Sequence, residues 1–237
     1  AQSKNLVDTI TYNSMLHGLA KLDVIDSQKA LELFEQAKLE NRANLVTYSS
    51  IIYVLAKSKP SSLVKATEIF EQAKTLFPIL DEIIYANILL CIGNSESIQS
   101  TQIMKYFREC LSQKLMNSYI TANTLYALSK SYQPDVELAL EVLDIAKSHG
   151  FADKITYANT LDTVVYACVL DIFAHSASVD VEKAYGIFKE AKEQNMVNHI
   201  SYASMIQIIS KSNPPQLQLA LDLFAEVKEK YHLDSHV

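Results

Sequence analysis

Glycine, proline and tryptophan are scarce in this chain of 237 residues, which has four glycines, five prolines and no tryptophan. The glycines lie at positions 18, 93, 150 and 186, never closer than 36 residues apart. A P-loop and a dinucleotide-binding fingerprint each need two glycines within about six residues, so both phosphate-binding motifs are excluded. An all-β fold would need a turn about every ten residues, which so few turn-forming residues argue against. The composition therefore favours an all-α protein.

Cysteines, long apolar runs and positive charge are also in short supply. Cys91, Cys110 and Cys168 form no close pair, which predicts buried free thiols in a reducing compartment. No run of about 18 apolar residues is present, so we expect no membrane contact, and the N-terminus shows no targeting pattern. The formal net charge of −6 argues mildly against a nucleic-acid partner.

Known catalytic and metal-binding motifs are missing as well. The sequence contains no Gly-x-Ser-x-Gly, no His-Glu-x-x-His and no Cys-x-x-Cys. We therefore expect no enzyme activity, no metal, no cofactor and no small-molecule substrate.

The sequence does contain six versions of one short phrase, beginning with Ile10-Thr11-Tyr12-Asn13. Its tyrosine position falls at Tyr12, Tyr48, Tyr85, Ala122, Tyr157 and Tyr202, and the first four intervals are 36, 37, 37 and 35 residues. Small and apolar residues follow each copy at i, i+4 and i+7, as in Ala30, Phe34 and Ala37, which is the spacing of one helix face. Each repeat is therefore predicted to be a pair of helices.

The fifth repeat is longer than the others. Tyr157 keeps the interval to the preceding copy, whereas Tyr166 lies 36 residues before Tyr202. We interpret residues 153–176 as one overlong first helix, and a kinked or split helix is the alternative. The starts of second helices are marked by prolines and candidate N-caps, namely Pro60, Pro134, Pro214, Pro215, Asp135 and Asp180.

A pair of helices of about 36 residues cannot bury its own apolar face, so the pairs must stack around a shared core. We expect one domain over residues 1–237, an α-solenoid of about six helix-turn-helix repeats of 35–37 residues. The predicted repeats span 8–44, 45–81, 82–118, 119–153, 154–198 and 199–234. Neither end has an obvious polar capping helix, which indicates a piece of a longer array or a chain that pairs through its ends.

The recurring phrase, followed by Ala30-Leu31-Glu32-Leu33-Phe34-Glu35, resembles the pentatricopeptide repeat family over nearly the whole chain. The tetratricopeptide repeat has a 34-residue period with a tryptophan and a Leu-Gly pair, both of which are missing here. The resemblance implies a right-handed α-solenoid that binds single-stranded RNA, one base per repeat, in mitochondria or plastids.

The resemblance also implies which residues contact RNA. The residue two before the tyrosine position wedges a base in this family, which gives Ile10, Val46, Ile83, Ile120, Ile155 and Ile200. The residue after the tyrosine position reads the base together with the last residue of the repeat. Three such pairs are Asn13 with Asn44, Ser49 with Asp81, and Asn123 with Asp153, which favour cytosine, guanine and uracil in that order.

Each of these residues also has a plain structural interpretation. An aliphatic residue near the start of a first helix is typical of any amphipathic helix, and Asn13 and Asn44 could equally be helix caps. The other three repeats carry Ala86, Ala158 and Ala203 at the reading position, where an alanine offers no hydrogen-bonding group. Tight sequence-specific binding is therefore not expected.

Four lysines lie eight or nine residues after the tyrosine position, where they would contact phosphates: Lys21, Lys57, Lys130 and Lys211. The helix dipole favours lysines at the same place without any ligand. Acidic residues are concentrated in the predicted second helices. This acidity and the three alanines favour an alternative function, a protein-binding scaffold within a larger complex, whereas the lysines and the three filled reading pairs favour RNA.

Overall fold

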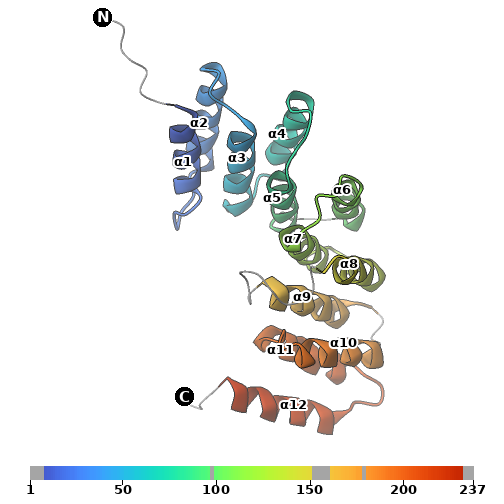
Figure 1. Ribbon diagram of the computed structural model, residues 1–237. Coiled ribbons are helices and arrows are strands. Elements are labelled where there is room, and N and C mark those ends of the chain that lie inside the picture. Colours follow the sequence, from blue (N-terminus) through green and yellow to red (C-terminus); the bar gives the residue numbers. More distant parts are fainter. Residues whose placement is uncertain (1–7, 97–98, 151–160, 178–179, 232–237) are drawn as a thin grey trace, which may run out of the picture. The chain divides into compact units, whose positions relative to one another are not determined.

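The computed structural model describes residues 8–96, 99–150, 161–177 and 180–231 (Figure 1). Within these ranges the chain is helical and contains no strand, which confirms the all-α prediction. The helices are α1 (Thr9–Leu19), α2 (Ser27–Leu39), α3 (Leu45–Lys57), α4 (Leu63–Leu76), α5 (Glu82–Gly93), α6 (Ser100–Ser112), α7 (Ser118–Ser129), α8 (Val136–Ser148), α9 (Leu161–His175), α10 (Val181–Glu193), α11 (His199–Ser210) and α12 (Leu217–Lys230).

The chain forms two compact units, Ala1–Met116 with α1 to α6 and Asn117–Val237 with α7 to α12. In the first unit, α1 packs against α3 and α3 against α5, while α2 and α4 each contact the odd-numbered helix before and after them (Figure 1). The second unit repeats this order, with α7, α9 and α11 packed in sequence and α8 and α10 each contacting two of them. Odd-numbered helices are the first helices of the predicted pairs, and even-numbered helices are the second.

First helices start at an Asp or Asn that caps the helix. The side chain of this residue accepts a hydrogen bond from the backbone N–H three residues further on, which satisfies one of the donors left open at a helix start. These N-caps are Asp8, Asn44, Asp81, Asn117 and Asn198, for α1, α3, α5, α7 and α11. The predicted caps Asp135 and Asp180 of second helices α8 and α10 are confirmed.

A serine ends most first helices in the same way. Its hydroxyl donates to the carbonyl three residues earlier, at 2.6 to 3.0 Å, and so satisfies an acceptor in the last turn. These serines are Ser58, Ser95, Ser131, Ser176 and Ser212. The start and end of a first helix are therefore both fixed by local side-chain hydrogen bonds.

Aromatic rings join each second helix to the first helix that follows it. Phe34 meets the ring of Tyr48 edge to face at 4.9 Å between centroids. The same contact recurs between Phe70 and Tyr85 at 5.2 Å and between Phe188 and Tyr202 at 5.1 Å. The rings in these pairs are buried, so the tyrosine and phenylalanine positions read from the sequence form the core between consecutive helix pairs.

The N-caps correct the tyrosine position of the fourth repeat. Tyr12, Tyr48, Tyr85 and Tyr202 are each the fourth residue after an N-cap, and in α7 the fourth residue after Asn117 is Thr121. The assignment to Ala122 was one residue too far along. Without a tyrosine in this helix the sequence phrase fits at either residue, and only the cap decides between them.

In the fifth repeat the tyrosine position belongs to Tyr166. Its hydroxyl donates to Glu190, 24 residues later, as Tyr202 does to Glu226. Tyr157 lies outside the described residues. The overlong helix expected over 153–176 lies partly outside them as well, and the described helix, α9, runs from Leu161 to His175.

A lysine, a glutamate and the core tyrosine connect consecutive helix pairs. Glu109 of α6 accepts from the Tyr85 hydroxyl at 2.7 Å and pairs with Lys74 of α4 at 2.6 Å. Glu190 is held in the same way by Tyr166 and Lys147, and Glu226 by Tyr202 and Lys192, at 2.7 to 2.8 Å. We call these three groups the Lys–Glu–Tyr connectors.

The connectors shift the pKa of their members in opposite directions. Burial would raise the pKa of each glutamate, but the hydrogen bonds from lysine and tyrosine outweigh it, so the pKa values of Glu109, Glu190 and Glu226 are lowered. Burial, followed by the hydrogen bond to the carboxylate, raises the pKa of Tyr85 and Tyr202. The ionised glutamate and the neutral phenol are therefore the stabilised forms.

Candidate functional site

The starts of the first helices carry a row of exposed apolar residues. Ile10, Val46, Ile83 and Ile200 are each the second residue after an N-cap, and their side chains are 46 to 72 % exposed. A helix that only buried its apolar face would not expose an aliphatic side chain at the same place in every pair. These four predicted base-wedging residues are therefore available to a ligand.

The fourth member of this row is Tyr119 and not Ile120. Ile120 is 0 % exposed and belongs to the core, whereas Tyr119, the second residue after Asn117, is 58 % exposed. The prediction was wrong because it inherited the one-residue error at Ala122. Ile155 lies outside the described residues, and Val164 of α9, two before Tyr166, is partly exposed.

A pocket of about 230 Å³ lies on the first-helix side, between α3 and α5. Two of its walls are the apolar residues Val46 and Ile83, which the sequence assigned to wedging. Ser49 and Asp81, assigned to reading the base between them, also line it. The structure thus brings together all four residues predicted for one base.

Further residues complete this pocket: His17, Ser50, Tyr53 and Asn87. The His17 ring stacks on the ring of Tyr53 at 6.5 Å and 21°, which gives the pocket an aromatic side. Sequence reasoning missed these residues. His17 and Tyr53 share one repeat position, five residues after Tyr12 and Tyr48, so aligning the repeats position by position would have found them.

The polar groups of the pocket are held by neighbouring helices. The Asn87 amide donates to the backbone carbonyl and the hydroxyl of Ser49, at 3.0 and 3.1 Å. The Asp81 carboxylate accepts from the N–H of Ile84 at 3.0 Å as the cap of α5. These contacts position a hydroxyl, an amide and a carboxylate around one small space, and such groups can bond the edge of a base.

The first reading pair, Asn13 and Asn44, is also brought together. The Asn13 amide donates to Asn44 Oδ1 at 3.4 Å, and Asn13 Oδ1 accepts from the Thr47 hydroxyl at 2.7 Å. Asn44 caps α3 and forms a capping box with Thr47. The alternative interpretation as a cap is therefore confirmed for Asn44, whose carboxamide already has three protein donors.

The third reading pair does not form as predicted. Asp153 lies outside the described residues, and Asn123 is two residues after the corrected tyrosine position, where Asn87 lies in α5. The residue directly after the tyrosine position is an alanine in four repeats: Ala86, Ala122, Ala167 and Ala203. Only Asn13 and Ser49 offer a polar side chain there.

The four lysines lie at the opposite ends of the first helices. With the corrected position in α7, each of them is nine residues after its tyrosine position. Lys57 ends α3, Lys130 and Lys211 cap α7 and α11, and Lys21 follows α1. At 1.5 Å per residue, Lys57 lies about 16 Å along the helix from Val46.

Some of these lysines already have partners in the protein. Lys211 donates to the backbone carbonyl of Ala174 at the end of α9. The ammonium groups of Lys57 and Lys130 lie over the rings of Tyr53 and Tyr126, at 5.7 and 5.8 Å. Lys57 and Tyr53 therefore link the lysine row to the aromatic side of the 230 Å³ pocket.

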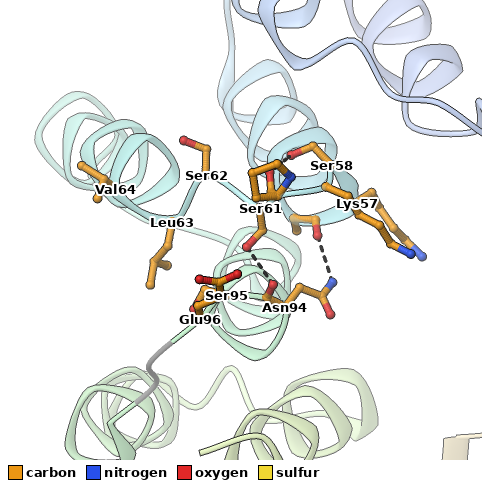
Figure 2. A pocket seen from close by; sticks show the side chains of 12 residues that line it. Lys57, Ser58, Ser61, Ser62, Leu63, Val64, Asn94, Ser95 and Glu96 are labelled. Atoms are coloured by element: carbon orange, nitrogen blue, oxygen red, sulfur yellow. Dashed lines mark hydrogen bonds between the residues drawn. The ribbon is translucent and has the colours of Figure 1, made fainter.

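A larger and more open hollow of about 920 Å³ lies where α3 and α5 end (Figure 2). Asn94 donates to the carbonyl of Ala56 at 2.9 Å, and Ser61 donates to the Asn94 carbonyl at the same distance. Apart from Lys57, no predicted site residue lines it. Its polar groups bond to one another and hold the connection between α3 and α4 in place.

In the described ranges, no three acidic, histidine or cysteine side chains are grouped so that they could hold a metal ion. Nor is any described helix long and apolar enough to cross a membrane.

No protein-family profile matches the chain, and no curated protein matches its sequence.

Proposed function

We propose that the chain binds single-stranded RNA without catalysis, as a pentatricopeptide-like protein whose helix pairs form a right-handed α-solenoid. The supporting observation is the pocket between α3 and α5, because Val46, Ser49, Asp81 and Ile83 all line it. Two apolar walls and polar groups between them match what a splayed-out base needs, since its faces are apolar and its edge forms hydrogen bonds.

The proposed base at this pocket is guanine. Its Watson–Crick edge presents N–H donors that a carboxylate can accept, and Asp81 supplies that carboxylate next to the Ser49 hydroxyl. The same reasoning assigns a pyrimidine, cytosine, to Asn13 and Asn44. Repeats with an alanine after the tyrosine position would hold a base by contact with the exposed apolar row alone, so the sequence preference is partial.

The net charge of −6 limits the strength of this binding. Phosphate contacts provide most of the affinity of a protein for nucleic acid and make it salt-dependent. Four lysines in one row, of which Lys211 already bonds a carbonyl, provide few such contacts. We therefore propose weak binding with a shallow dependence on salt.

The test is fluorescence anisotropy with labelled single-stranded RNA, in which the second base of each register is guanine or adenine. Val46→Ser should weaken binding by about tenfold, the effect of losing one base contact of 1–3 kcal/mol. Val64→Ser is the matched control, because Val64 is an equally exposed valine on second helix α4, away from the pocket. Asp81→Asn should reduce the preference for guanine.

Measurements at about 50 and 200 mM salt, with duplex RNA alongside, separate base contacts from charge. Equal affinity for duplex and single strand, or equal loss in the two serine variants, would contradict the proposed site.

A protein-binding scaffold is the second candidate, and the four alanines after the tyrosine position favour it. Small side chains and an exposed apolar row suit an apolar peptide or helix better than the polar edge of a base. A chain that binds no RNA at low salt, but retains a protein in pull-downs that Val46→Ser abolishes and Val64→Ser does not, would establish this function instead.

A further inference from the structure

The last second helix, α12, exposes a face that the other second helices bury. Phe224, the eighth residue after the cap position of α12, is 57 % exposed. The residues at the same place in helices that are followed by another pair in their own unit are at most 1 % exposed, namely Phe34, Phe70, Leu143 and Phe188.

The earlier pairs show what covers this face. Phe34, Phe70 and Phe188 each meet a tyrosine of the next first helix. Four residues further on, a lysine of the same helix reaches the next second helix, as Lys192 does to Glu226 and Lys38 to Gln72, the latter at 3.5 Å. Lys228 is the next lysine in this series and forms no ion pair within the described part of the chain.

Helix α11 is open on the same side as α12. Ala203, the residue after Tyr202, is exposed, whereas Ser49, Ala122 and Ala167 at the same repeat position are buried. The α11–α12 pair thus presents the complete surface on which a following helix pair packs elsewhere in the chain.

At the other end, α1 exposes the complementary surface. Met15, three residues after Tyr12, is 45 % exposed, and its counterparts Ile51, Ile88, Val169 and Met205 are 0 % exposed. Gly18 is exposed too, and a Cβ there would touch nothing within 4 Å. This face of α1 is the one that a preceding first helix covers in the other pairs.

We propose that copies of this chain associate head to tail, with α11–α12 of one copy docked on α1–α2 of the next. A second copy is the occupant because both halves of the junction are present on one chain, in the repeat positions that pack together inside each unit. The second helix α2 carries Gln36 at the position of Gln72, so Lys228 would meet Gln36 of the second copy as Lys38 meets Gln72.

This contact joins two different surfaces, so it leaves one of each open and adds further copies as concentration rises. It does not depend on RNA. Sedimentation velocity of the full chain from about 1 to about 200 μM, without RNA, brackets a micromolar dissociation constant. We expect the weight-average mass to rise steadily with concentration beyond that of a dimer.

Two variants test the geometry. Phe224→Asp removes the α12 surface and Met15→Asp removes the α1 surface, so each alone should be monomeric. An equimolar mixture should form dimers and nothing larger, because each variant retains the surface that the other has lost. Val64→Asp, at an exposed valine of α4 outside both surfaces, should associate like the unchanged chain.

Circular dichroism and thermal melts check that the variants keep their helices. A chain that stays monomeric over the whole range would overturn the proposal, since its ends would then not recognise each other. Association that survives either variant, or a mixture that stays monomeric, would overturn it as well, because the contact would use another surface.

Discussion

The hydroxyl of Tyr166 donates to the carboxylate of Glu190 at 2.8 Å, 24 residues further along the chain. Tyr85 with Glu109 and Tyr202 with Glu226 have the same separation, so this contact places α9 in phase with the other first helices. The interval from Thr121 to Tyr166 is 45 residues, nine more than the 36 from Tyr166 to Tyr202. The extra residues lie between α8 and α9, and the packing of α9 is that of an ordinary first helix.

Removing this hydrogen bond should destabilise the second unit. Tyr166→Phe leaves the buried ring in place and deletes only the donor to Glu190, so we expect a loss of about 1 kcal/mol. The value is at the low end for a charged acceptor because the Glu190 side chain is 36 % exposed. Urea denaturation measures the change, with Tyr132→Phe as control at an 88 % exposed tyrosine. Equal midpoints for the two variants would show that the bond contributes nothing.

Acid should weaken the fold through the connectors. Because the pKa values of Glu109, Glu190 and Glu226 are lowered from 4.5, their contribution to stability is fully present above pH 4.5 and is lost as pH falls below it. Urea midpoints should therefore drop between pH 5 and pH 3. In Glu190→Gln the drop should be smaller, because a carboxylate that titrates on folding has been removed. An unchanged slope would contradict the role of Glu190.

The cap of α7 offers a test with a built-in control. Asn117→Ala removes the acceptor for the Ile120 N–H and should cost about 1 kcal/mol. Asn117→Asp keeps an acceptor of the same shape, as Asp81 does in α5, and should preserve stability. Should both variants lose the same amount, the amide itself and not the cap would be what matters at this position.

The three cysteines should resist thiol reagents while the protein is folded. Burial raises the pKa of Cys91, Cys110 and Cys168 to about 12, so the reactive thiolate is rare at pH 8. A chromogenic disulfide reagent should react with none of them rapidly in buffer and with all three in guanidinium. Fast reaction of one thiol in the native protein would place it at a surface.

Periodicity alone predicted much of the fold. Phe34 and Tyr48 repeat at a nearly constant interval, and that interval was enough to predict two helices per repeat, because a buried face must recur with the structure that buries it. The caps Asp135 and Asp180 could be predicted because a carboxylate before an apolar run has few other uses.

Sequence reasoning failed where packing or local hydrogen bonds decide. At Ile120 and Tyr119 two neighbouring registers fit the phrase, and the bond from the Ile120 N–H to Asn117 selects one of them. His17 and Tyr53 come from different helices, so their stacking depends on how α1 packs against α3, which no local pattern contains. The pocket residues Val46 and Ile83 could be predicted because exposure at a helix start recurs in every pair.

The connectors differ in charge from one junction to the next, and this difference sets an order of disassembly. Between α2 and α4 the acceptor is Gln72, a neutral amide that acid cannot protonate. From α8 to α12 both junctions depend on ionised carboxylates, Glu190 and Glu226. Acidification should therefore separate α8, α10 and α12 from one another while α1 to α4 stay together, so that one end of the chain frays at a pH that leaves the other end folded.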